Sequence, residues 1–428
     1  MDLKQVKTEL YNDKTGIIRR INKLNTPVGA VPLCAVVVTG NPVINDKLET
    51  IIDSRYPGLG FDFEDYEKAE IRAIGEFIER YASTVIPKKL LNKGSYTDLT
   101  NSNLNAMDPL TITRIRDEDL LKYQKKGLEL SKDTEFYWIE GFDELKNISV
   151  WVPTDLVYLL PNQHNSFPIR DIISTGLATG PTLLDAKING LLECIERDAI
   201  VIMWQNKISF PKIKLDSIKS DLVKSKIKYM NQQGLDVVIL DISTDIPIPV
   251  YFCIIKNSSI PYFSVGAGAH FKDEIALESA FKEAITTYNG NVIRSFNSDS
   301  TFNMPMDLGS FKDMDEHSDL YSDNDFKDSL IFLEQGEEID FTAKDNRITT
   351  YTELLAHLIT LNIDYFTVDL TTRDLKDASL HVVRSITPQL AYLECSLPML
   401  DCSRIKEVPK KLGYKVNNEY NTMPHPFP

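Results

Sequence analysis

Long uncharged apolar runs are missing from this chain of 428 residues, so the sequence predicts no membrane-spanning helix. The N-terminus, MDLKQVKTEL, also lacks the apolar stretch of a secretory signal peptide. Basic charge is in short supply, because 47 Lys and Arg face 62 Asp and Glu and the net charge is -15. Nucleic acids and membrane surfaces are themselves polyanionic, so this balance argues against both as general partners.

Cysteine is also scarce, and it follows no metal-binding or disulfide pattern. The chain contains five cysteines without any CxxC pair: Cys34, Cys194, Cys253, Cys395 and Cys402. This argues against a zinc ribbon and a disulfide framework, and it fits a reduced, cytoplasmic setting. Standard nucleotide motifs are missing too, since there is no GxxxxGK[ST] and no GxGxxG after a strand.

Helix and strand patterns are interspersed along the chain without strict βαβ alternation, which favours an α+β layered fold. Apolar periodicity predicts helices over 67–86, 182–205 and 273–290. The strand predictions are 27–40, a strand pair around Pro153 in 149–160, two strands in 236–256, and a strand that follows a helix in 349–370. Residues 295–330 are rich in Asp and Ser, so we expect a solvated loop there.

Two of the predicted helices carry the same E-x-I-E-R sequence, in AIGEFIERYAS (73–83) and GLLECIERDAI (190–200). The match leaves an internal duplication open. Within each copy the two glutamates are three residues apart and share one helix face: Glu76 with Glu79, and Glu193 with Glu196. The second helix is apolar almost all round, so its charged groups need a partner.

A hard divalent cation such as Mg²⁺ would suit these carboxylates, and Glu283 in the third helix is a further candidate ligand. Ordinary intrahelical pairs with Arg80 and Arg197 remain the alternative. The glycine-rich stretch STGLATGPT (174–182) opens a helix, where backbone N–H groups could face an anion. A plain helix start with Thr182 as N-cap explains the same stretch equally well.

Several ordered blocks resemble the YcaO superfamily. The main ones are EKAEIRAIGEFIERY (67–81), STGLATGPTLLDAKINGLLECIERDAI (174–200) and GAGAHFKDEIALESAFKEA (266–284), followed by VDLTTRD (368–374), HVVRSITPQL (381–390) and SRIKEVPKKLGY (403–414). The resemblance spans nearly the whole chain and implies a single YcaO-type domain over 1–428 with mixed sheets. The last residues, PHPFP (424–428), resemble the PxPxP tail of the azoline-forming branch, the D-type subunits of thiazole/oxazole-modified microcin and streptolysin-S-like pathways.

The resemblance implies that ATP and Mg²⁺ bind among the helix glutamates. By position, the metal ligands are Glu76, Glu79, Glu193, Glu196 and Glu283. Arg80 and Arg197 would be charge partners in the cofactor site, and Asp185 stands where the family often has Glu. The tail prolines, Pro424, Pro426 and Pro428, are the predicted catalytic element. Alternating prolines form a stiff rod that could hold the carboxylate of Pro428 at a fixed place, to order the site or to act as a base.

The resemblance also implies the activity, ATP-dependent cyclodehydration of Cys, Ser or Thr in a ribosomal precursor peptide. The expected partners are that peptide and a leader-binding, E1-like C-type subunit, while an FMN dehydrogenase and a homodimeric state are left open. Two alternatives remain, a YcaO enzyme that forms thioamides or amidines and a non-catalytic scaffold. Departures from the broad family pattern bear on the scaffold: Arg72, Pro181, Ser279 and Thr286.

Overall fold

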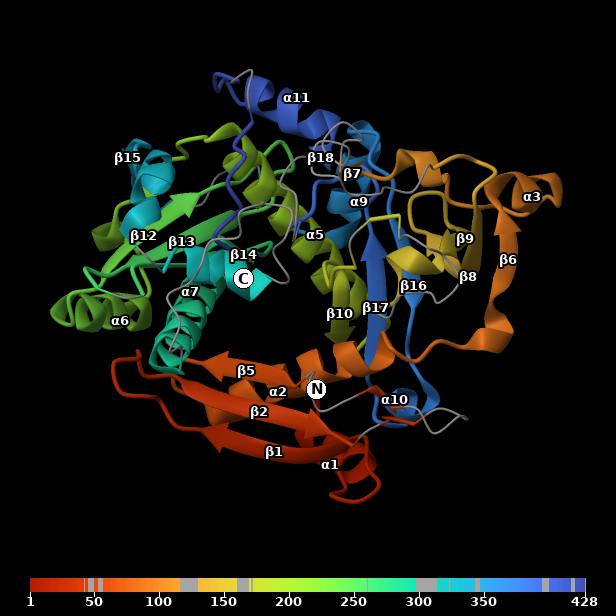
Figure 1. Cartoon of the computed structure of the whole chain (residues 1–428), viewed down its shortest axis with the longest axis horizontal. Helices are drawn as coiled ribbons and strands as arrows, with labels where there is room; N and C mark the ends of the chain where they lie inside the picture. The colour runs from red at the N-terminus through yellow and green to blue at the C-terminus, as the bar shows by residue number, and fades with distance from the viewer. Residues whose placement is uncertain are drawn as a thin grey trace.

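The computed structural model describes residues 1–41, 43–44, 50–52, 57–115, 130–159, 169–170, 172–259, 261–297, 314–322, 324–342, 347–394, 400–416 and 420–427. In this part of the chain, three sheets of three or more strands are packed with helices into one layered α/β arrangement (Figure 1). This agrees with the predicted mixture of helices and sheets. The internal duplication stays a prediction.

The N-terminal sheet has the antiparallel order β1-β2-β5, with β1 at Ile18–Leu24, β2 at Cys34–Gly40 and β5 at Gly58–Asp62. The predicted strand over 27–40 is therefore shorter at its start, where Gly29 has a φ of 82° in a turn. Helix α2, Tyr66–Ala82, lies on β5. A Cβ on Gly60 would meet the carbonyl oxygen of Ala69 at 1.9 Å, so the helix backbone rests directly on the strand.

Helix α2 ends at Ala82 and not at the predicted residue 86. The N–H groups of Thr84 and Val85 donate to carbonyls three residues back, which tightens the last turn. Pro87 then disfavours helical backbone at the residue before it.

The six-stranded sheet has the order β10-β17-β16-β8-β6, and β9 pairs with β8. Its strands are β6 (Asn92–Ser95), β8 (Glu135–Asp143), β9 (Ile148–Pro153), β10 (Leu177–Gly180), β16 (Phe366–Asp369) and β17 (His381–Ile386). Only β9 forms in 149–160, because the chain turns into the 3-10 helix η3 at Thr154–Leu156; the predicted strand pair there is wrong. Helix α9, Tyr351–Thr360, and β16 confirm the predicted helix and strand of 349–370.

The five-stranded sheet has the order β14-β13-β12-β11-β15. Its strands are β11 (Lys212–Ile213), β12 (Asp236–Asp241), β13 (Val250–Lys256), β14 (Phe263–Ala269) and β15 (Glu338–Ile339). Two of them confirm the strand pair predicted in 236–256. Helix α7, Asp273–Asn297, packs on β14 and β13. Helix α5, Leu183–Asn206, contacts this sheet as well as β10 and β17, so it lies between the two larger sheets (Figure 1).

The Asp- and Ser-rich segment 295–330 was expected to be a solvated loop, and its described part differs. Helix α7 runs on to Asn297, and the segment also holds α8 (Met314–Leu320) and the start of the 3-10 helix η6 (Asn324–Glu334). Leu320 and Tyr321 are fully buried in the core against α5. Burial of a few apolar side chains stabilises these short helices despite the acidic composition.

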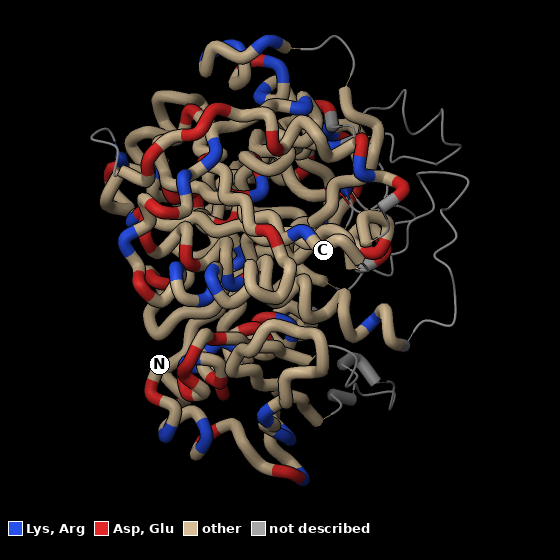
Figure 2. The backbone as a smooth tube through the Cα atoms, turned by 90° about the vertical axis from the view of Figure 1, so that its left-hand side faces the viewer, with Lys and Arg blue, Asp and Glu red and all other residues tan. Residues whose placement is uncertain are grey.

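Shorter elements complete the described chain: α1 (Leu3–Leu10), α3 (Tyr96–Asn101), α6 (Asp221–Gln232), α10 (Arg373–Asp377), α11 (Ser403–Lys411), β3 (Val43–Ile44), β4 (Thr50–Ile52), β7 (Arg114–Ile115), β18 (Leu400–Asp401), η1 (Lys88–Leu90), η2 (Pro109–Thr111) and η4 (Leu215–Ser217). No helix among the described residues is long and apolar enough to cross a membrane. Basic and acidic residues are interspersed over the face seen in Figure 2.

Candidate functional site

The five predicted glutamates lie on three helices, and each accepts a backbone N–H from a strand or from its flanking loop. On α2, the N–H of Leu59 donates to Glu76 Oε2 at 2.8 Å. The N–H of Thr179 donates to Glu79 Oε1, also at 2.8 Å, across 100 residues of sequence. These bonds join α2 to β5 on one side and to β10 of the six-stranded sheet on the other.

The remaining glutamates are held in the same way. On α5, Glu193 Oε2 accepts the N–H of Gly176 at 3.1 Å, and Glu196 accepts the N–H of Ala269. On α7, Glu283 Oε2 accepts the N–H of Ala267 at 2.6 Å. The E-x-x-E spacing therefore aims successive carboxylates at strands that belong to different sheets.

The carboxylates are close enough to influence one another's charge. Burial, and after it the neighbouring charge of Glu193, raises the pKa of Glu79 to about 8. The pKa of Glu196 is also raised to about 8, chiefly by burial, which outweighs the opposing charge of Arg197 and is reinforced by Glu283. Burial likewise raises the pKa of Glu76 and of Glu283, against the influence of the nearby arginines. Burial and mutual repulsion thus disfavour the charged form of these carboxyl groups in the absence of a cation.

Arg197 is the positive centre of this cluster. Its Nη2 lies 3.6 Å from Glu193 Oε1 and its Nη1 lies 3.5 Å from Glu196 Oε1. The buried Nη1 makes no hydrogen bond. Arg80 lies 3.6 Å from Glu76 on α2. The intrahelical pairs foreseen as an alternative are therefore present, but they are long and leave acidic groups in excess.

The donor set fits a magnesium–phosphate ligand. Carboxylate oxygens are the hard ligands that Mg²⁺ prefers, and an added cation would relieve the repulsion between buried acids. Among the described residues, no three acidic, His or Cys side chains are already grouped closely enough to hold a metal. Mg²⁺ commonly takes one or two carboxylates and completes its shell with phosphate oxygens and water. The orphaned Arg197 Nη1 is a suitable donor for such a phosphate.

The described hydrogen bonds of Asp185 are made with Thr182 and not with the glutamate cluster. It stands in the first turn of α5, where its N–H donates to Thr182 Oγ1 at 3.1 Å and its Oδ2 accepts the Thr182 hydroxyl at 2.6 Å. Thr182 is the N-cap of α5, as one of the two interpretations of the glycine-rich stretch predicts. The described contacts of Asp185 are those of a helix start.

Residues 423–427 contact α5, and residues 424–427 are buried. The Trp204 indole N–H donates to the carbonyl of Met423 at 2.8 Å, and the Tyr321 hydroxyl donates to that of Pro424 at 2.6 Å. Pro424 and Pro426 are both buried. The guanidinium of Arg197 lies 4.3 Å from the centre of the Phe427 ring. The tail therefore reaches the arginine between the glutamates, whereas Pro428 lies outside the described residues.

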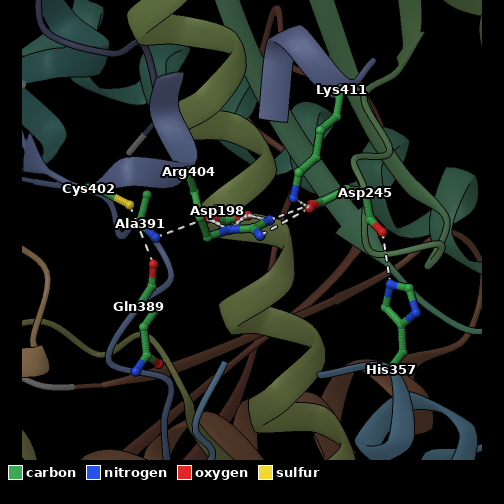
Figure 3. A network of polar contacts seen from close by, with 8 residues as sticks. All are labelled: Asp198, Asp245, His357, Gln389, Ala391, Cys402, Arg404 and Lys411. Atoms are coloured by element: carbon green, nitrogen blue, oxygen red, sulfur yellow. Dashed lines mark hydrogen bonds and ion pairs between the residues drawn. The ribbon is translucent and has the colours of Figure 1, made fainter. Parts of the chain in front are cut away.

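Sequence reasoning missed a buried ion-pair network one residue beyond Arg197 (Figure 3). Asp198 is fully buried, accepts the N–H of Ala391 at 2.9 Å and pairs with Arg404 of α11 at 2.7 Å. Arg404 also reaches Asp245 at 2.7 Å. A carboxylate in an otherwise apolar helix was the available signal, because such a group requires a partner. The network fixes the turn of α5 that carries Glu196.

Two of the departures from the family pattern have local roles. Arg72 of α2 donates to the Phe61 carbonyl at 2.6 Å and pairs with Asp62, so it ties the helix to the end of β5. Ser279 lies against Gly268 of β14, where a Cβ on the glycine would meet that of Ser279 at 2.9 Å. Both residues position α2 and α7 on their strands.

Comparison with known proteins agrees with this geometry. The profile described as "YcaO cyclodehydratase, ATP- and Mg²⁺-binding" matches residues 63–391. An uncharacterised protein in the tfuA 3′ region of Rhizobium leguminosarum bv. trifolii is 31% identical over 126 residues, which are 29% of this chain and 30% of that relative. The match thus spans under a third of that curated relative.

Three solved structures share the fold at low identity. A heterocyclase in complex with substrate and cofactor has a TM-score of 0.74 at 17% identity, covering 99% of this chain and 57% of the other. A YcaO protein from Methanopyrus kandleri bound with AMPPCP and Mg²⁺ has a TM-score of 0.59 at 16% identity, and the match covers 87% of this chain and 86% of the other. A chain of the E. coli microcin synthetase McbBCD complex with pro-MccB17 bound has a TM-score of 0.64 at 14% identity, and the match covers 98% of this chain and 99% of the other.

The family profile covers well over half of the chain and includes all three glutamate-bearing helices. This chain is therefore a member of the YcaO cyclodehydratase family, whose members bind ATP and Mg²⁺.

Proposed function

We propose that this chain is the D-type subunit of an azoline-forming system. It would convert Cys, Ser or Thr of a precursor peptide into thiazoline or (methyl)oxazoline. One observation supports this branch above all: the described tail residues 424–427 are buried and reach the glutamate cluster through the Phe427–Arg197 contact. A tail that only covered the core would have no need to meet the arginine shared by Glu193 and Glu196.

In this proposal the metal ligands come from Glu76, Glu79, Glu193, Glu196 and Glu283, and Asp185 belongs to the wider nucleotide site. Arg80 and Arg197 balance the charge, and Arg197 Nη1 donates to a phosphate oxygen. Bound Mg-ATP supplies the phosphoryl group that turns the amide oxygen into a leaving group. The protein residues hold the helices, keep water away and fix the tail, so that the carboxylate of Pro428 can order the site or accept a proton.

The proposal includes a precursor peptide and a separate leader-binding, E1-like subunit, in a reducing cytoplasmic setting. One solved neighbour is titled as a synthetase complex with its precursor bound, which supports such an assembly. The four described cysteines, Cys34, Cys194, Cys253 and Cys402, are free. An FMN dehydrogenase would act later, on the azoline product.

A non-catalytic scaffold is the second candidate. One observation favours it: in the described part of the chain, no three metal-binding side chains are preassembled. A scaffold would form the same complex without consuming ATP.

Mass spectrometry of a Cys- and Ser-rich precursor incubated with the protein, its partner subunit and Mg-ATP tests the proposal. We expect the loss of one water per ring with matching phosphate release. Glu193→Gln should abolish both, because it removes a carboxylate next to Arg197. Glu67→Gln, an exposed change on α2, is the matched control and should keep full activity. An unmodified precursor in a verified complex that binds ATP tightly would favour the scaffold.

A further inference from the structure

A second concave site lies on the six-stranded sheet. It is a groove of about 980 Å³ lined by residues of β8, β9, β16 and β17 and of the segment before β6. Its size is within the usual range of ligand pockets. None of the five predicted glutamates is among its described lining residues, so it is distinct from the nucleotide site.

The groove opens where the sheet splays. Strands β8 and β16 pair at only two positions, Asp143 with Phe366 and Phe142 with Thr367. Strand β6 pairs with the same edge of β8, but only from Glu135 to Trp138. Between these partners, Glu140 of β8 and Asp369 of β16 line the groove and do not pair with each other.

The backbone groups at this opening face into the groove. Opposite Glu140 on β9, the N–H and carbonyl of Trp151 bond to Asn105 and Met107 on the far side. In an antiparallel pair hydrogen-bonded and non-bonded positions alternate, so the N–H and carbonyl of Glu140 point away from β9. The bond from Leu370 to Val382 likewise leaves the backbone of Asp369 directed at β8. Two strand edges therefore face the same space.

We propose that this groove binds an extended segment of the peptide substrate, which joins the sheet as an added strand. The main-chain groups would pair with the edges at Glu140 and Asp369, in the manner of other strand-addition sites. Apolar rim residues would contact the peptide side chains; Leu90 is 65% exposed there. Identifying the occupant as the substrate rests on the proposed function.

The groove is continuous with the nucleotide site through the sheet. Val383 of β17 lines the groove and pairs with Ala178 of β10. The next residue, Thr179, donates its N–H to Glu79. Lys187 of α5 also lines the groove, and its Nζ lies 2.5 Å from Glu144 Oε1. A peptide strand between β8 and β16 would therefore be separated by two strands, β16 and β17, from β10, whose Thr179 holds Glu79.

Fluorescence anisotropy with a labelled Gly/Ser/Cys peptide of about eight residues, within the range of strand lengths, tests the inference. Leu90→Asp should weaken peptide binding by about tenfold, or 1.4 kcal/mol, and leave ATP binding unchanged. Leu110→Asp is the matched control, since Leu110 is 50% exposed and lies outside the groove. N-methylation of alternate peptide residues should weaken binding as well, because it removes main-chain donors.

Equal peptide affinity of the Leu90 and Leu110 variants, or no binding by the unaltered protein, would overturn the inference. The precursor assay separates it from the proposed function. If rings form but Leu90→Asp leaves the peptide KM unchanged, the groove assignment is wrong and the function stands. If the peptide binds in a Leu90-dependent manner and no rings form, the groove stands and the cyclodehydratase assignment is wrong.

Discussion

At the scale of single residues, the glutamates combine two demands that usually conflict. Glu196 is buried and the other four are partly buried, yet each also accepts a backbone N–H that favours its charged form. Burial is the largest influence on Glu79 and Glu196, and the pKa of both is raised to about 8. Near neutral pH these two side chains therefore carry protons until a cation replaces them.

This protonation predicts how stability depends on pH in the absence of Mg-ATP. A carboxyl group whose pKa is raised in the folded state binds more protons there than in the unfolded state, between its ordinary pKa of 4.5 and about 8. The free energy of unfolding should therefore fall as the pH rises through that window. Glu79→Gln should flatten the dependence, because the amide does not titrate.

Urea unfolding at several pH values between 5 and 8 measures the effect. Glu67→Gln, exposed on the same helix, should keep the unaltered slope. If Glu79→Gln and the unaltered protein lose stability in parallel, the carboxyl does not titrate as described.

At the scale of elements, close helix–strand contacts set the positions of the carboxylates. A Cβ on Gly60 would lie 1.9 Å from the Ala69 carbonyl oxygen and 2.3 Å from the Ala73 nitrogen. Both are backbone atoms of α2, which cannot move without shifting the helix. Gly60→Ala should therefore push α2 off β5, cost about 1–3 kcal/mol of stability and weaken ATP binding.

Gly75→Ala is the matched change on the helix itself. A Cβ there meets nothing within 4 Å, so this variant should gain about 0.5–1 kcal/mol from helix propensity. Thermal unfolding and ATP titration of the two variants provide the measurement. If Gly60→Ala changed neither the thermal stability nor the ATP affinity, the position of α2 would not depend on this contact.

Helices were the most predictable part of the fold. The helix of 182–205 has an apolar pattern and a threonine cap, and α5 matches it within a residue at each end. The sheet order was not predictable, because β10 pairs with β17 across some 200 residues without any local signal. The backbone donors of the glutamates, such as Thr179, were hidden for the same reason. The helices of 314–334 were missed because a few buried side chains outweigh an acidic composition.

At the scale of the whole molecule, described residues near the end of the chain, from Arg404 to Asn421, hold the second half of α5 in place. Asn206 donates to the Ile405 carbonyl at 2.8 Å, Asn421 donates its N–H to the Gln205 carbonyl at 2.8 Å, and Arg404 pairs with Asp198. These contacts hold the turns that follow Glu193 and Glu196, so the late part of the chain determines where the central glutamates lie.

Removal of Arg404 should therefore be costly. Arg404→Met leaves Asp198 buried without its cation, and such a loss costs about 3–5 kcal/mol. Lys411→Met is the control, because Lys411 is 53% exposed and its contact with Asp245 is 3.5 Å long; we expect a change within about 0.5 kcal/mol. Chemical denaturation distinguishes them, and equal stability of both variants would contradict a supporting role for Arg404.

The pairing of β10 with β17 has a consequence for how the protein folds. Contacts between such distant residues form late and slowly, because the entropic cost of closing a long loop comes before the contacts contribute any stability. Glu79 and Glu193 acquire their backbone donors only beside this strand pair. A nascent or partly folded chain therefore lacks the arrangement of glutamates that we expect to bind Mg-ATP. The same slow closure exposes apolar strands during synthesis, so we expect the yield of active protein to depend on chaperones.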